Sequence, residues 1–109
     1  MKFPIATLAA AAALLSAGGA HAMDAAAAKA LASKSACLAC HATDKKLVGP
    51  SYKDVAAKYK GTDAATLGAS IKAGGSGKWG PVPMPAQPNL KDEDAKTLAA
   101  WILAGAPAK

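Results

Sequence analysis

Residues 37–41 read CLACH, and this stretch holds both cysteines of the chain and one of its two histidines. Positions i and i+3 lie on one face of a helix, so Cys37 and Cys40 can both reach one flat group while His41 directs its ring at the centre of that group. This spacing is typical of c-type haem attachment. We therefore expect one haem c, bound covalently through two thioethers.

Three other uses of these residues fit the sequence less well. A structural zinc site needs four Cys or His ligands, and the only other histidine, His21, lies in a segment that we expect to be removed. A thioredoxin-like redox pair normally follows a strand, and no strand pattern precedes Cys37. A plain disulfide remains open, although it would leave the position of His41 without a reason.

The N-terminal segment, residues 1–22, has the three regions of a secretory signal peptide. It begins with one lysine, continues with an apolar stretch from Ile5 to Ala17, and ends in small residues. The apolar stretch is shorter than the about 20 residues that a membrane span needs, so we expect no membrane anchor after cleavage. We expect cleavage after Ala22, export to an oxidising compartment such as a bacterial periplasm, and one domain over residues 23–109.

Hydrophobic periodicity in the exported segment predicts an all-α fold of about four helices. We expect helices from 24 to about 39, from 52 to about 60, from 63 to 73, and from 92 to about 104, with the first and last packed together. Ser51 is a plausible cap of the second helix. Gly68 lies inside the third, so either that helix is weak or another backbone approaches there.

Large apolar side chains are few in this alanine-rich segment, so its hydrophobic core is thin. A domain of this size buries a low fraction of its surface and needs a covalent staple or a large apolar group at its centre. A covalently held porphyrin would provide both.

The exported segment has no histidine besides His41, so the candidates for the second face of the iron are Met, Lys or no side chain at all, and among these we favour Met84. It lies in a segment, residues 74–89, whose four glycines and four prolines predict an extended loop. Prolines on both sides of Met84 restrict the backbone and lower the entropy lost when the thioether is held at a metal. The alternative is a flexible side chain that fills a gap in the core.

Four stretches, CLACH, LVGPSYKDVAAKY, GGSGKWGPVPMP and DAKTLAAWIL, together resemble the class I c-type cytochromes. The likeness is greatest to the short bacterial monohaem group that carries electrons to nitrite reductases and terminal oxidases. It implies the small cytochrome c fold, with His41 and Met84 as the axial ligands. It also implies that the Pro50 carbonyl accepts a hydrogen bond from His41 and that the Trp79 indole donates to a haem propionate.

The stretch after Met84 looks one residue longer than in this family. Asn or Gln side chains near the methionine donate to its sulfur in the family, so we expect this of Gln87, with Asn89 as the competing donor. Lys91 stands where a capping side chain would be expected. Trp101, on the last helix, is expected in the core.

An iron held by His and Met on opposite faces has no vacant site, so we expect a one-electron carrier and not an enzyme. It would diffuse as a monomer between a membrane donor complex and a terminal reductase or oxidase. Two alternatives are a haem enzyme or gas sensor with an open or labile distal site, and an electron-transfer subunit of a larger reductase. The net charge of +6 comes from lysines without arginine, which favours acidic protein partners over nucleic acid.

Overall fold

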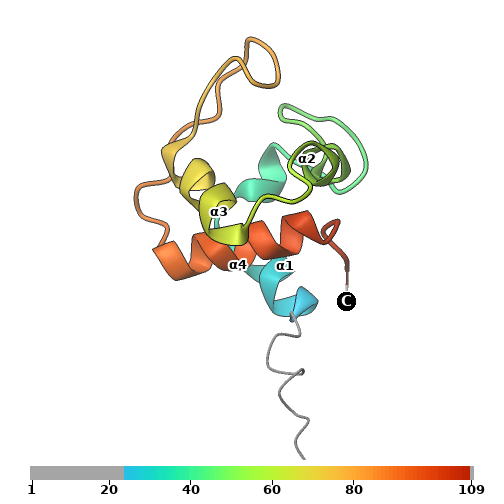
Figure 1. Ribbon diagram of the computed structural model, residues 1–109, viewed down its shortest axis with the longest axis vertical. Coiled ribbons are helices and arrows are strands. Elements are labelled where there is room, and N and C mark those ends of the chain that lie inside the picture. Colours follow the sequence, from blue (N-terminus) through green and yellow to red (C-terminus); the bar gives the residue numbers. More distant parts are fainter. Residues whose placement is uncertain (1–23, 109) are drawn as a thin grey trace, which may run out of the picture.

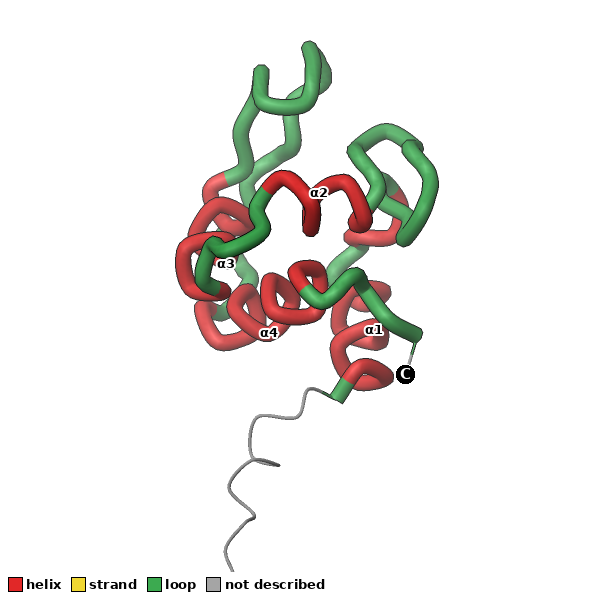
Figure 2. Tube along the Cα trace, turned by 45° about the vertical axis from the view of Figure 1, so that its right-hand side comes forward, coloured by secondary structure: helices red, strands yellow, loops and turns green. Residues whose placement is uncertain are grey.

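The computed structural model describes residues 24–108, which form four α-helices and one short 3₁₀ helix without a strand. The elements are α1 (Ala25–Lys34), η2 (Cys37–Ala39), α2 (Tyr52–Lys58), α3 (Ala64–Ala73) and α4 (Asp92–Leu103). In Figure 1, α4 crosses the centre of the molecule and the loop between α3 and α4 extends away from the helices. Figure 2 shows the two long loops on either side of α2. The predicted all-α fold is confirmed.

The predicted signal peptide, residues 1–22, lies outside the described residues. Within 24–108, no helix combines the length and the apolar character that crossing a bilayer requires.

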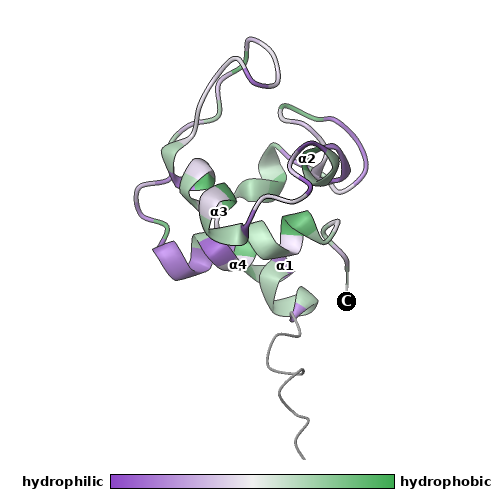
Figure 3. Ribbon diagram, viewed as in Figure 1, coloured by the Kyte–Doolittle hydropathy of each residue, from purple (hydrophilic) through white to green (hydrophobic). Residues whose placement is uncertain are grey.

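Helix starts follow the capping chemistry of the sequence. The Ser51 hydroxyl accepts a hydrogen bond from the Asp54 amide at 3.1 Å, so the predicted cap of α2 is confirmed. Lys91 precedes α4 without a side-chain cap. Three acidic residues in the first turn of α4 favour the positive end of the helix dipole instead, and Figure 3 shows this turn as hydrophilic.

The predicted first helix is wrong at its C-terminal end. It stops at Lys34, and Ala36 takes a left-handed conformation with φ of 63° before η2 begins at Cys37. Helix propensity favours continuation through these alanines, but a left-handed residue reverses the chain direction. Tertiary structure overrides propensity here because the cysteine segment has to turn toward the centre of the fold.

The core lies where α4 packs against α1, α2 and α3. Leu98 and Trp101 of α4 are almost fully buried, and the Trp101 indole donates to the Pro107 carbonyl at 2.9 Å. The predicted core role of Trp101 and the pairing of the first and last helices are therefore confirmed. The buried face of α1 consists of Ala25, Ala28 and Ala32.

Gly68 lies where α3 crosses α4. A Cβ built on Gly68 would lie 3.1 Å from backbone atoms of Ala95 and Lys96. A helix interior normally disfavours glycine by roughly 1 kcal/mol, so close backbone approach is the reason for it here. The second of the two explanations predicted for Gly68 is confirmed.

Candidate functional site

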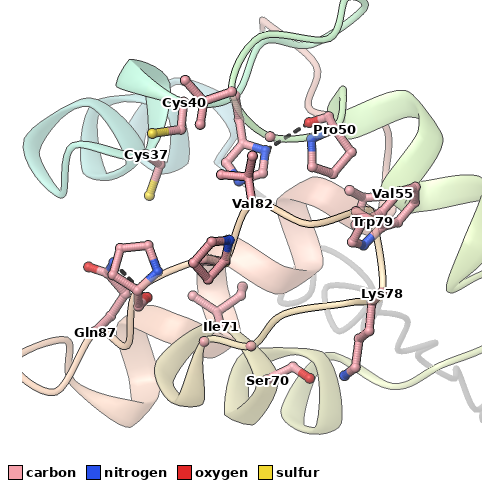
Figure 4. A pocket seen from close by; sticks show the side chains of 18 of the residues that line it. Cys37, Cys40, Pro50, Val55, Ser70, Ile71, Lys78, Trp79, Val82 and Gln87 are labelled. Atoms are coloured by element: carbon pink, nitrogen blue, oxygen red, sulfur yellow. Dashed lines mark hydrogen bonds between the residues drawn. The ribbon is translucent and has the colours of Figure 1, made fainter.

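A cavity of about 420 Å³ opens between η2, α2, α3 and the loop of residues 74–91. This volume lies in the range of cofactor and small-molecule sites. Figure 4 shows its walls, with the cysteines on one side, Val55 and Trp79 on another, and Ile71 of α3 below. All six residues predicted for the site line this one cavity: Cys37, Cys40, His41, Pro50, Trp79 and Met84.

Cys37 and Cys40 are half-buried, and neither sulfur forms a disulfide. Both point to the same side of the cavity in Figure 4. Burial raises the pKa of the Cys37 thiol, because the charged thiolate loses its solvent. Within residues 24–108, no three His, Cys, Asp or Glu side chains cluster as a metal site.

His41 is held in a fixed orientation by three contacts. Its Nδ1 lies 2.7 Å from the Pro50 carbonyl oxygen. A carbonyl can only accept, so Nδ1 carries the proton and Nε2 keeps its lone pair. The Tyr52 ring stacks on the imidazole with centroids 4.9 Å apart, and a Cβ built on Gly49 would lie 2.6 Å from Cε1 of His41.

Tyr52 connects the His41 side of the cavity to the core. Its ring meets Trp101 edge to face at 5.4 Å, and the side chain is 3% exposed. Burial is the main cause of a raised Tyr52 pKa, with the nearby Cys37 thiol as a lesser one. The hydroxyl therefore stays neutral across the physiological range.

Met84 belongs to the loop of residues 74–91 and packs partly buried against the core. Its backbone pairs with Gly75 through two hydrogen bonds of 2.7 and 3.0 Å. Gly74 has φ of +67°, and a Cβ there would lie 2.5 Å from the Met84 carbonyl oxygen. The side-chain amide of Gln87 donates to the Pro85 carbonyl at 3.3 Å. This bond uses one of its two N–H groups, so the expected donation to the Met84 sulfur stays a prediction.

Trp79 lies at the rim of the cavity and is 37% exposed. Its ring is 6.4 Å from that of Tyr59 and 4.4 Å from the ammonium of Lys58. Val48 and Val82 are more exposed still, at 56% and 58%, and also line the cavity. An apolar rim therefore surrounds the opening.

Sequence reasoning did not identify three residues of this site: Gly49, Tyr52 and Gly74. The glycines act through close approach to segments distant in sequence, which no local pattern indicates. Tyr52 was predicted only as part of a helix face. Its place directly after the GPS turn that follows His41 was the available signal.

Comparison with known proteins places the site in a family. The family model described as Cytochrome c matches residues 25–106. A cytochrome c-551 of Azotobacter vinelandii is 59% identical over 69 residues, which cover 62% of this chain and 83% of that protein. A cytochrome c-552 of Nitrosomonas europaea is 56% identical over 75 residues, 67% of this chain and 73% of that protein. The crystal structure of wild-type Nitrosomonas europaea cytochrome c552 superposes with a TM-score of 0.66 at 54% identity, covering 70% of this chain and 96% of that one.

Proposed function

The chain belongs to the cytochrome c family, and from this premise we propose that Cys37 and Cys40 attach its haem and that His41 and Met84 bind the two faces of the iron. Its relatives are small class I monohaem cytochromes of bacteria, and its function is electron transfer by a covalently bound haem c. When bound, haem c supplies the one-electron change between ferric and ferrous iron.

The observation that carries this assignment is that four matching donors line one cavity, three from residues 37–41 and the fourth from the loop of residues 74–91. Two thiols suit the two thioethers, and the imidazole and the thioether suit the iron. The Pro50 carbonyl holds the proton on Nδ1 of His41, so the Nε2 lone pair is the one left to bind metal. Prolines and the Gly75 pairing restrict the backbone of Met84, which lowers the entropy lost when its sulfur is held.

The cavity favours a carrier over a haem enzyme. Peroxide chemistry needs an acid or base near the open face of the iron. Among the described residues that line the cavity there is no carboxylate and no histidine besides His41. The cavity thus supplies ligands and largely apolar walls without the distal carboxylate or second histidine that such chemistry commonly uses, so we propose that the protein is not an enzyme.

Replacing Met84 tests the ligand assignment. In Met84→Ala we expect loss of the weak near-infrared sulfur-to-iron band of the oxidised protein, a lower reduction potential, and ready carbon monoxide binding by the reduced protein. Val82→Ala is the matched control, because Val82 is exposed in the same loop and also lies between prolines. Carbon monoxide binding by the undamaged wild-type protein would contradict the assignment.

The charge around the opening supports a docking proposal. Lys46 and Lys78 line the cavity beside the exposed Val48 and Val82. We propose that this rim docks acidic redox partners, among them a membrane donor complex and a terminal reductase or oxidase. Lys72 is less suited to this role, because its ammonium pairs with Asp92.

Stopped-flow electron transfer to a purified acidic partner tests the docking role across a salt series. Steering charges are screened beyond about 8 Å at physiological salt, so the association rate should fall as salt rises. Lys46→Gln and Lys78→Gln should flatten this dependence. Lys29→Gln, on the exposed side of α1, should leave it unchanged. A flat dependence in the wild type would mean that docking is apolar.

We also propose export to the periplasm as a monomer, with residues 1–22 as the signal. The three-part pattern of this segment supports the proposal. N-terminal sequencing of the exported protein should begin at Met23, and an N-terminus that retains residues 1–22 would contradict it.

A further inference from the structure

Trp79 lies in the tip of the loop, residues 76–82, and its ring lies near the C-terminal end of α2. Inside this tip the backbone makes one hydrogen bond, from the Gly77 amide to the Gly80 carbonyl at 3.2 Å. The backbone pairing of Gly75 with Met84 closes the base of the tip. The backbone N–H of Gln87, in the segment that follows, donates to the Lys72 carbonyl. These backbone hydrogen bonds do not fix how the tip is oriented toward the cavity. Side-chain contacts have to fix that orientation.

Lys58 of α2 makes that connection. Its ammonium donates to the Lys78 carbonyl at 3.0 Å, across twenty positions of sequence. The same ammonium lies 4.4 Å from the centroid of the Trp79 ring and 5.8 Å from that of Tyr59. A cation over an aromatic face is attracted to its electrons, and the contact at Trp79 is well within the distance at which this attraction acts.

The position of Lys58 on its helix also favours this arrangement. It is the last residue of α2, where the carbonyl end of the helix favours a cation. A lysine that only solvates the surface has no reason to satisfy a carbonyl and an aromatic face of another segment together, because either contact costs side-chain entropy. Here one ammonium joins α2 to two consecutive residues of the tip, Lys78 and Trp79.

We propose that Lys58 is a positioning residue that holds the loop tip over α2 and fixes the Trp79 indole at the rim of the cavity. The proposal rests on the proposed function and on the role that the family resemblance implies for Trp79, the donation of its N–H to a haem propionate. Lys58 then acts through Trp79. The proposal requires no contact between Lys58 and the cofactor. Figure 4 shows Trp79 and Lys78 side by side on the loop, next to Val55 of α2.

Hydrogen exchange in the reduced holoprotein tests the proposal, followed by NMR at the Gly77 amide and the Trp79 indole. In Lys58→Gln we expect both to exchange roughly five- to tenfold faster, the scale of one exposed cation–π contact with a charged hydrogen bond. Lys58→Arg should restore slow exchange, because guanidinium also donates and stacks on aromatic rings. Lys60→Gln removes an exposed charge two residues away and should change neither rate.

Two results would overturn the proposal. One is equal exchange in Lys58→Gln and Lys60→Gln. The other is equal acceleration of the Trp101 indole, which donates to Pro107 in the core and reports global opening.

The Gly77 amide separates this proposal from the function on which it rests, because its bond lies within the tip. If Trp79→Phe leaves the reduction potential unchanged, the propionate role of Trp79 fails. The role of Lys58 is still decided by the Gly77 exchange rate.

Discussion

The crossing of α3 and α4 and the loop of residues 74–91 hold their shapes by different means. At the crossing, Gly68 allows two backbones to meet and Leu98 and Trp101 are almost fully buried. In the loop, Trp79 is 37% exposed and Val82 58%, and the shape depends on prolines, a few backbone hydrogen bonds and the contacts of Lys58. The proposed ligand Met84 therefore lies on the region with little packing of its own. The other proposed ligand, His41, is tied through Tyr52 to the packed core.

Of the substitutions considered, Gly74→Ala should destabilise the loop of residues 74–91 most. The new Cβ would lie 2.5 Å from the Met84 carbonyl oxygen, and φ of +67° disfavours any side chain. We expect a loss of more than about 3 kcal/mol in the free energy of unfolding, since backbone strain and overpacking each contribute roughly 1–3 kcal/mol. Guanidinium unfolding and the sulfur-to-iron band measure the effect.

Gly77→Ala is the control for Gly74→Ala, because Gly77 has φ of +86° with nothing near its Cβ position. Gly77→Ala should show the cost of a side chain at positive φ without the steric clash between the new Cβ and the Met84 carbonyl. Equal losses in the two variants would mean that contact with the Met84 segment is unimportant.

Gly49→Ala should affect the His41 side to a smaller extent. Its Cβ would lie 2.6 Å from the imidazole, which is a side chain and can shift, although the Pro50 bond and Tyr52 resist. We expect a loss of roughly 1–3 kcal/mol in unfolding free energy and a changed reduction potential. Gly61→Ala, where the Cβ meets open space away from the cavity, should leave the potential unchanged. An unaltered potential in Gly49→Ala would show that the ring is not confined.

Gly68→Ala should have the smallest effect. Alanine gains roughly 1 kcal/mol of helix propensity, but its Cβ would press on the α4 backbone at 3.1 Å. Overpacking costs typically 1–3 kcal/mol, so we expect a net loss of about 1 kcal/mol in thermal or denaturant unfolding. Ala69→Gly, on the exposed side of α3, should lose about the same through propensity alone. Stabilisation by Gly68→Ala would show that α3 and α4 can move apart at their crossing without loss of stability.

Prediction from sequence succeeded where short-range chemistry decides the structure. Ser51 caps α2, the acids begin α4, and the CLACH spacing brings the cysteines and His41 to one cavity. It failed at Ala36, because alanine propensity gives no sign of a left-handed residue.

Contacts between segments that are separated along the chain could not be predicted from the sequence either. Gly49 and Gly74 are needed only because His41 and the Met84 backbone come close to them. The side chain of Gln87 donates to Pro85, an acceptor that the family pattern does not indicate.

The buried alanine face of α1 has a consequence for how this protein tolerates change. Ala28, Ala32 and the facing core residue Ala99 of α4 are 0% exposed. Each already has the smallest side chain, so almost every random substitution there adds volume to a filled space, and glycine weakens the helix. We therefore expect most substitutions at these buried alanines to destabilise the fold. A substitution at the exposed Val82 meets solvent, so we expect that position to tolerate change better than the buried alanines.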